Sequence, residues 1–186
     1  MENLTVHFES TPNPQSLKFM INRQIVDDPV AFTTSTEAEE SPLAQKLFGF
    51  PWMQGVFIGH NFVTITKQDW VEWDVLSEPL RELIEEHLRS GSPIIGSASS
   101  ASNEHSTEQD SDPLVIQIKK VIEDEVRPAV AMDGGDILFH KFENNVVYLK
   151  MKGSCSGCPS SSQTLRMGIQ GRLQELFPEV REVVAV

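Results

Sequence analysis

The sequence predicts a protein of the α+β class, built as two small α+β domains joined by a flexible linker. Short runs of alternating apolar and polar residues indicate strands, and runs with apolar residues three or four positions apart indicate helices. Residues 90–112 are rich in Ser, Gly and acidic residues and carry hardly any apolar residue after Ile95. Such a segment buries too little surface to offset its chain entropy. We therefore expect domains at 1–90 and 113–186, with the linker over 91–112.

Strands and turns of the first domain follow from alternation and from proline. Residues 4–8 and 17–21 alternate and predict two strands. Between them, Thr11-Pro12-Asn13-Pro14 must be a loop, because proline removes backbone donors and restricts the residue before it. Residues 56–58 and 62–66 flank a Gly-His-Asn turn and predict a hairpin.

Two helices are expected in the same domain. Ser41 is the expected N-cap of the first, with Pro42 at its first position. Ser77 is the expected N-cap of the second, which carries an apolar face of leucine and isoleucine residues. Trp70 and Trp73 are most simply core residues. Nothing in this domain indicates catalysis, and neither His60 nor His87 has a companion metal ligand nearby in the sequence.

The second domain is predicted to run α-β-β-α-β. Asp112 and Pro113 open a helix that Pro128 is expected to end. The elements that follow are a glycine turn at Asp133-Gly134-Gly135-Asp136, a hairpin over 137–142 and 146–152, a helix from Thr164 to Phe177, and a closing strand over 180–186. The apolar face of that last helix is expected to be Leu165, Ile169, Leu173 and Leu176. A hard-metal site at the two aspartates of the turn is disfavoured, since Mg²⁺ or Ca²⁺ needs more oxygen ligands.

Charge and hydropathy narrow the partners and the compartment. The net charge is −12, of which residues 1–89 carry −8, residues 90–112 carry −4, and residues 113–186 carry none. An acidic surface disfavours nucleic acid, because phosphate binding needs basic residues. No apolar run approaches the length of a membrane span, so we expect no membrane partner. Residues 1–10 are acidic and resemble no targeting segment, which predicts a cytoplasmic protein.

Both cysteines of the chain, Cys155 and Cys158, lie in one Cys-x-x-Cys motif between the predicted hairpin and the last helix. Cys158 precedes Pro159, so it falls near the N-cap, where free N–H groups and the helix dipole favour a thiolate. Gly153 and Gly157 allow amide groups to approach sulfur, and we expect them to leave the sulfurs accessible. Lys150, Lys152 and Arg166 cluster around this loop in the sequence. They either form a solvated face or offset the charge of a thiolate-ligated metal centre.

A soft-metal centre or redox chemistry both suit this motif. Structural zinc and the common iron–sulfur clusters each take four ligands, and one chain offers two thiolates, so two copies are needed to complete such a site. A dithiol–disulfide oxidoreductase would use the same pair at a helix N-terminus. Its usual setting is a strand within a βαβ unit, whereas this motif follows a hairpin. A zinc-stapled interaction module is a further alternative.

The motifs resemble those of Nfu proteins, with their NifU-type C-terminal domain. In the second domain the resemblance is carried by Asp133-Gly134-Gly135-Asp136, Gly153-Ser154-Cys155-Ser156-Gly157-Cys158-Pro159-Ser160-Ser161-Ser162 with Thr164-Leu165, Gly168-Ile169 and Pro178-Glu179-Val180. In the first it is carried by Thr11-Pro12-Asn13-Pro14, Lys18-Phe19, Ser41-Pro42-Leu43-Ala44, Gly55-Val56-Phe57 and Phe62-Val63-Thr64-Ile65-Thr66-Lys67. The resemblance covers nearly the whole chain apart from the linker.

This resemblance implies an iron–sulfur carrier rather than an enzyme. Cys155 and Cys158 would bind a [4Fe-4S] cluster shared across a homodimer, although two thiolates per chain suit a [2Fe-2S] cluster equally well. The implied partners are apo iron–sulfur client proteins and upstream cluster scaffold proteins, with the first domain contributing to their recognition.

Overall fold

The computed structural model describes residues 4–96, 112–155 and 159–186, with the backbone alone over 159–165. The chain divides into two compact units, the first over residues 1–101 and the second over 102–186. Each unit contains one sheet and its helices, so the predicted α+β class is confirmed. The predicted domain limits and the linker stay predictions, because most of 91–112 lies outside the described residues.

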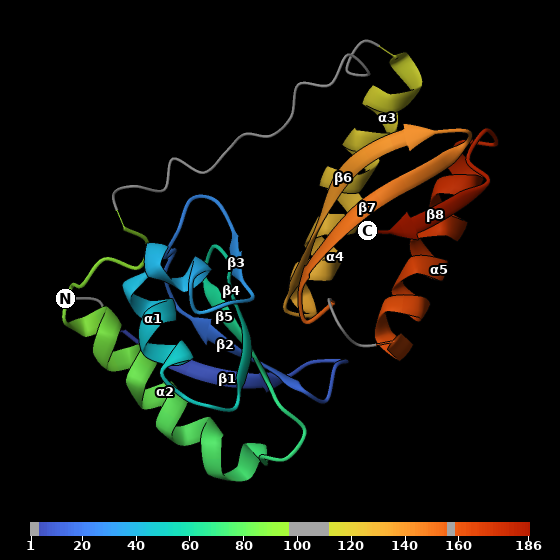
Figure 1. The fold of residues 1–186 in the computed structure, drawn as a ribbon. Helices are drawn as coiled ribbons and strands as arrows, with labels where there is room; N and C mark the ends of the chain where they lie inside the picture. The colour runs from blue at the N-terminus through green and yellow to red at the C-terminus, as the bar shows by residue number, and fades with distance from the viewer. Residues whose placement is uncertain (1–3, 97–111, 156–158) are drawn as a thin grey trace. The chain divides into compact units, whose positions relative to one another are not determined.

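Unit 1 is built on a five-stranded sheet in the order β1-β2-β5-β4-β3, with every neighbouring pair antiparallel. Its strands are β1 (Val6–Ser10), β2 (Ser16–Ile21), β3 (Val30–Phe32), β4 (Met53–Ile58) and β5 (Phe62–Lys67). Its helices are a 3₁₀ turn η1 (Glu37–Glu40), α1 (Pro42–Phe48) and α2 (Trp73–Arg89). Figure 1 shows α1 and α2 over one face of the sheet, where they enclose the core of the unit.

The start of α1 confirms the predicted cap, and the start of α2 does not. Ser41 Oγ accepts a hydrogen bond from the backbone N–H of Ala44 at 3.1 Å. Helix α2 begins at Trp73, four residues before the expected cap Ser77, which is a buried interior residue. The helix begins early because the indole of Trp73 donates to the carbonyl of Pro14 at 2.9 Å and so anchors this turn to the β1–β2 loop.

Trp70 corrects a second expectation about unit 1. Its side chain is 68% exposed rather than buried in the core, because it lies in the loop between β5 and α2. Trp73 is half-buried and packs at the edge of the core.

Residues 93–96, which we expected to belong to the linker, are held by unit 1. Ile94 and Ile95 pack against its core. Ser41 Oγ donates to the carbonyl of Ile94 at 2.5 Å, and Gly96 N–H donates to the carbonyl of Glu40 at 2.6 Å. The ordered part of unit 1 therefore continues past the end of α2.

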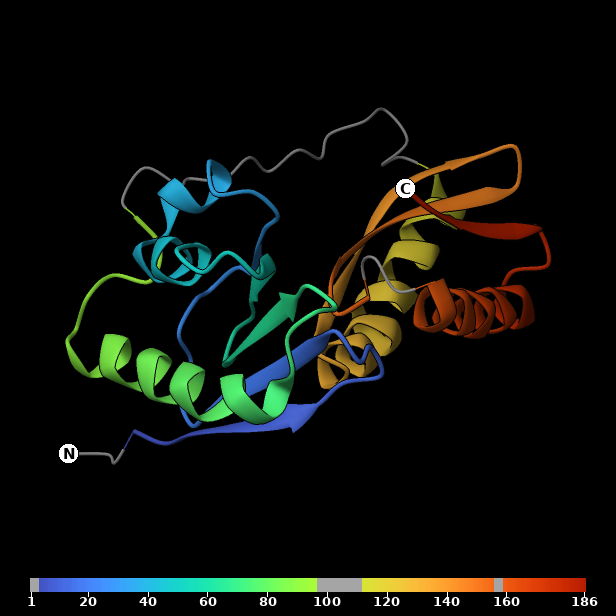
Figure 2. The same ribbon diagram turned by 60° about the horizontal axis from the view of Figure 1, so that its bottom comes forward.

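Unit 2 is built on a three-stranded sheet in the order β6-β7-β8. Its strands are β6 (Gly135–Glu143), β7 (Val146–Gly153) and β8 (Glu182–Ala185), and its helices are α3 (Pro113–Val121), α4 (Arg127–Met132) and α5 (Pro159–Leu176). Strands β6 and β7 are antiparallel, and β8 is parallel to β7. Figure 2 shows the helices gathered on one side of this sheet, consistent with the residues of its core.

Helical structure continues through Pro128, contrary to prediction. A single π turn η3 (Ile122–Val126) joins α3 to α4, and Arg127 N–H donates to the carbonyl of Ile122 five residues back. The wider turn changes the hydrogen-bond pattern next to the proline, whose missing N–H would otherwise interrupt an α-helix. The helix therefore reaches Met132 and delivers the chain to the turn at 133–136.

The remaining predicted elements of unit 2 are present, with one correction. Asn144 and Asn145 both have positive φ, 53° and 65°, as a tight two-residue hairpin turn requires. Ile169 and Leu173 are buried on α5, but Leu176 is 41% exposed. The helix ends at Leu176, and the buried residue at this end is Phe177.

Candidate functional site

The cysteine motif lies between the end of β7 and the start of α5. Helix α5 begins at Pro159, as predicted, and Gly153 closes β7 with φ at 70°, a conformation that favours glycine. Cys155 is described as a free thiol. Cys158, the other predicted ligand, lies outside the described residues.

Cys155 packs against a glycine of the turn that precedes β6. A Cβ added at Gly135 would lie 2.5 Å from Cys155 Sγ and 2.8 Å from the carbonyl oxygen of Lys152. No side chain fits at such distances, so position 135 must be glycine if the sulfur is to stay where it is. In register, Gly135 pairs with Gly153, which brings both ends of the hairpin to the thiol loop.

Ser154 fastens the thiol loop to the same turn. Its hydroxyl donates to the carbonyl of Asp133 at 2.5 Å, and its N–H donates to the carbonyl of Gly134 at 3.2 Å. Gly134 itself has φ at 81°, which confirms the predicted positive-φ glycine in this turn. Turn 133–136 and loop 153–155 thus form one hydrogen-bonded platform beneath Cys155.

A partly buried ion pair anchors the platform to the helix that leads into it. Arg127 donates two parallel hydrogen bonds to Asp136, from Nε to Oδ1 at 2.8 Å and from Nη2 to Oδ2 at 2.9 Å. Asp136 Oδ1 also accepts from the N–H of Ile137 at 2.8 Å. The hydrogen bonds with Asp136 raise the pKa of Arg127 the most, and the bond to Glu123 raises it further. Burial lowers this pKa, but by less than the two partners raise it. Because Arg127 occupies this carboxylate, Asp136 serves the fold rather than a hard metal ion.

The Cys155 thiol is protonated at neutral pH in this environment. Its side chain is only 5% exposed, so the sulfur is not accessible as we had expected from the flanking glycines. Burial raises the pKa of Cys155 to about 11, the hydroxyl of Ser154 lowers it somewhat, and the charges of Asp133 and Asp136 raise it further. The thiolate that the sequence predicts was expected at Cys158. Because Cys158 lies outside the described residues, this expectation stays a prediction.

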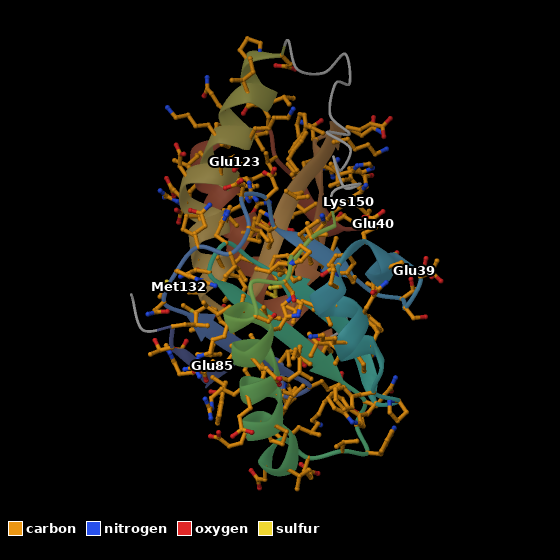
Figure 3. The ribbon with its side chains drawn as sticks, turned by 90° about the vertical axis from the view of Figure 1, so that its left-hand side faces the viewer. Glu39, Glu40, Glu85, Glu123, Met132 and Lys150 are labelled. Carbon is orange, nitrogen blue, oxygen red and sulfur yellow. The ribbon has the colours of Figure 1, made fainter. Side chains whose placement is uncertain are left out.

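The basic residues noted in the sequence lie on two elements. Lys150 and Lys152 are half-buried on β7, opposite Leu138 and Asp136 on β6, and Arg166 lies on α5. Figure 3 labels Lys150, whose side chain belongs to unit 2. That these cations offset a thiolate-ligated centre stays a prediction.

Further metal ligands are not grouped with Cys155. Among residues 4–96, 112–155 and 159–186 there is no group of three or more His, Cys, Asp or Glu side chains placed to hold a metal ion. Within the same ranges, no helix is long and apolar enough to cross a membrane.

Sequence reasoning did not identify Gly135 and Arg127 as parts that position Cys155. The Asp-Gly-Gly-Asp motif indicated a turn, but its contact with a residue twenty positions away depends on the hairpin register. Arg127 directly precedes Pro128, where we expected the helix to end. A helix that continues past this proline brings Arg127 to Asp136, and no other feature of the sequence indicated this contact.

The fold and the site define a two-unit α+β protein with a Cys-x-x-Cys loop between a strand and a helix. Two family models match it: "Scaffold protein Nfu/NifU N terminal" over residues 6–91 and "NifU-like domain" over residues 118–184. The chain belongs to the Nfu family of proteins.

Curated relatives match over almost the whole chain. The NFU1 iron-sulfur cluster scaffold homolog, mitochondrial, of Drosophila sechellia is 39% identical over 186 residues, covering 99% of this chain and 65% of the relative. The protein of the same name in Drosophila erecta is 40% identical with the same coverage. The chain thus spans somewhat less than two thirds of the length of these relatives. A solution NMR structure of a NifU-like protein from Saccharomyces cerevisiae is 24% identical, with a TM-score of 0.45, covering 50% of this chain and 86% of that one.

The predicted cytoplasmic location is wrong. The relatives are named as mitochondrial proteins, and this contradicts the prediction. The prediction rested on residues 1–10, and the lack of a targeting pattern in one stretch does not fix a compartment.

Proposed function

We propose that this protein carries an iron–sulfur cluster, which it holds through Cys155 and Cys158 and delivers to apo-proteins. The observation that carries the proposal is the built platform beneath Cys155, formed by Gly135, Ser154 and the Arg127–Asp136 pair. Relatives named as iron–sulfur cluster scaffold proteins support it. The cluster is cargo rather than a resident catalyst, so the role proposed is not enzymatic.

Two copies of the chain are needed to complete the ligand set. A [4Fe-4S] cluster takes four cysteine thiolates, and each chain has two cysteines. No further ligand group lies in the described part of the chain. A two-fold axis brings the same loop from each copy to a shared cluster. We therefore propose a cluster-bridged homodimer, with a [2Fe-2S] cluster as the alternative cargo of the same four thiolates.

Cluster binding should release a proton from Cys155. A coordinating thiol is deprotonated by the metal, whereas the free thiol, with its pKa of about 11, is protonated at neutral pH. Binding is therefore favoured by alkaline pH, and acidification favours release. A cargo held by a ligand that readily takes its proton back suits a carrier, which must also give up what it binds.

For the oxidoreductase alternative, the structure removes one argument against it and adds another. Because β8 lies parallel to β7, the strand before the thiols does belong to a β-α-β unit, and the hairpin argument made from the sequence does not hold. An oxidoreductase, however, needs a low-pKa thiolate to attack a disulfide. The first cysteine of this pair is buried, and its pKa is raised. Cys155 is therefore a poor attacking thiol, and an oxidoreductase would have to use Cys158, which lies outside the described residues.

The decisive test is native mass spectrometry of the full chain after anaerobic reconstitution with iron and sulfide. We expect one [4Fe-4S] cluster per two chains, and dimer formation that depends on the cluster. Cys155→Ser and Cys158→Ser should each abolish stable binding, because each deletes two of four ligands in the dimer. Gly168→Ala, on the open surface of α5, is the matched control and should bind normally. A complete cluster on a single chain would contradict the shared site, and zinc without sulfide would favour the zinc-stapled module.

A second test uses pH. If Cys155 of each of the two chains gives up a proton on binding, the apparent affinity for the shared cluster should rise between pH 7 and pH 9 by up to about tenfold per pH unit for each Cys155, or about a hundredfold for the pair. Competition with a chelator at several pH values measures this. A flat profile would show that Cys155 is not a ligand that must lose a proton.

A further inference from the structure

Two loops of unit 1 are tied into one surface. Three hydrogen bonds join the β1–β2 loop over 11–15 to the β5–α2 loop over 68–72 and to the residues that flank this second loop, Lys67 and Trp73. Gln15 Nε2 donates to Asp69 Oδ1, Lys67 N–H donates to the carbonyl of Gln15 at 2.9 Å, and Trp73 Nε1 donates to the carbonyl of Pro14 at 2.9 Å. The two loops therefore keep a fixed relation to each other.

The β1–β2 loop is also rigid within itself. Thr11 Oγ1 donates to the carbonyl of Asn13 at 2.9 Å, and Asn13 Oδ1 accepts from the N–H of Gln15 at 3.0 Å. Pro12 and Pro14 fix the backbone on either side of Asn13. A surface built this way loses little conformational entropy when a partner binds.

Large apolar side chains project from these tied loops. Trp70 is 68% exposed and Val75, in the first turn of α2, is 66% exposed. Pro14, whose carbonyl accepts the hydrogen bond from Trp73, is exposed as well. We call Pro14, Trp70 and Val75 the Trp70 surface. The other two tryptophans pack on neighbours, Trp52 against Phe50 and Trp73 beneath Lys67, so Trp70 is the exception among them.

Acidic side chains surround the Trp70 surface. Four exposed carboxylates lie next to it in the loop and the first turns of α2: Asp69, Glu72, Asp74 and Glu78. The nearby cations are already engaged. Lys67 is buried with its Nζ 5.4 Å from the ring centroid of Trp73, and Arg81 donates to Glu78 and Glu85. The local field is therefore negative, and it adds to the net charge of −8 on residues 1–89.

We propose that the Trp70 surface docks a basic segment of a partner protein that carries lysine or arginine together with an apolar side chain. A cation placed over an exposed indole is stabilised by the ring, and it is stabilised further by the surrounding carboxylates. Tryptophan is also one of the residue types enriched in interaction hot spots. The inference concerns unit 1 and is independent of cluster binding by unit 2.

The test uses the full chain and a short fluorescein-labelled peptide of Lys, Leu and Ser, followed by fluorescence anisotropy. Its counterpart, in which Glu replaces each Lys, should not bind. Trp70→Ala should weaken binding by about tenfold, and Trp70→Phe by less, because a ring remains. Ile116→Ala is the matched control: it removes an exposed apolar side chain from unit 2 and should stay within about twofold of the parent.

Two double variants distinguish the effect of carboxylates next to the Trp70 surface from the effect of the overall negative charge on peptide binding. Glu72→Gln with Asp74→Asn removes two charges beside the Trp70 surface and should weaken binding. Glu39→Gln with Glu40→Gln removes two charges from η1, an element separate from α2 and the loop before it, and should leave binding nearly unchanged. Equal effects of the two pairs would overturn the proposal, as would absence of binding or an unaltered affinity of Trp70→Ala. Self-association that Trp70→Ala abolishes would likewise overturn it, by making a second copy the occupant.

Discussion

The two units bury an ionisable side chain in opposite ways. In unit 1, His87 is fully enclosed, and its Nε2 lies 3.2 Å from the carbonyl of Pro93, so it fastens the segment after α2 to the helix. In unit 2, Cys155 is enclosed by the turn at 133–136, and Ser154 rather than the thiol makes the close hydrogen bonds that hold the loop. The His87 side chain joins two segments of unit 1, whereas Cys155 is kept in place by the hydrogen bonds of Ser154. The contact of the thiol with the Ser154 hydroxyl is long, 3.9 Å between Sγ and Oγ, so little would be lost if a ligand replaced it.

The largest effect should come from breaking the glycine contact of unit 2. Gly135→Val places carbon atoms where Cys155 Sγ and the carbonyl of Lys152 lie, so the thiol loop must move. We expect unit 2 to lose about 2–4 kcal/mol of its free energy of unfolding and the site to lose cluster binding. Hydrogen exchange followed by mass spectrometry reports the two units separately, and unit 1 should keep its protection. Normal cluster binding by this variant would contradict the proposal that the contact between Gly135 and Cys155 positions the ligand.

The next effect should come from the ion pair beneath the platform. Arg127→Leu leaves Asp136 buried without its bidentate partner, which should cost unit 2 about 2–3 kcal/mol. Arg172→Leu is the control, since it removes an exposed pair with Glu125 and should cost less than about 1 kcal/mol. Chemical denaturation measures both. Equal losses would mean that the Arg127 pair is no more than a surface contact.

A smaller effect should be a dependence of the stability of unit 1 on pH, through His87. Burial lowers the pKa of His87, with the charge of Lys46 adding to it and the hydrogen bond to Pro93 opposing it. The unfolded chain then binds a proton more readily than the folded one. The stability of unit 1 should therefore fall as pH drops below the ordinary histidine pKa of 6.5, by at most about 1.4 kcal/mol per pH unit.

His87→Gln provides the matched variant for this pH dependence. Glutamine can still donate to the carbonyl of Pro93, but it does not ionise in this range. Hydrogen exchange of residues 84–96 at several pH values, corrected for intrinsic rates, should lose most of its pH dependence in this variant. An unchanged profile would assign the effect to another group.

The smallest effect should be a stabilisation. Gly168 lies inside α5, and a Cβ there would meet nothing within 4 Å. Gly168→Ala should therefore raise the stability of unit 2 by about 0.5–1 kcal/mol through helix propensity. A thermal melt measures it, and the contrast with Gly135→Val shows which glycine the site requires. Destabilisation by Gly168→Ala would indicate a close contact in solution at this helix face.

The sequence by itself determined the parts of this protein that depend on local chemistry. Alternation located the described strands except β3, Ser41 and Asp112 marked helix starts, and the paired asparagines at 144–145 marked the hairpin turn. The spacing of Cys155 and Cys158 indicated the kind of chemistry. Each of these signals lies within a few residues of the element it defines, so one stretch of sequence contains the whole cause.

Only the tertiary structure decided what depends on distant residues. The seat of Cys155 on Gly135 follows from the β6–β7 register, the burial of its sulfur follows from that seat, and the raised pKa of the thiol follows from the burial. Helix α2 begins early because Trp73 reaches a carbonyl some sixty residues away, and Trp70 is exposed because the same anchor leaves it outside the core. Burial and hydrogen bonding are properties of surroundings, and these surroundings are assembled from segments whose meeting no local pattern encodes.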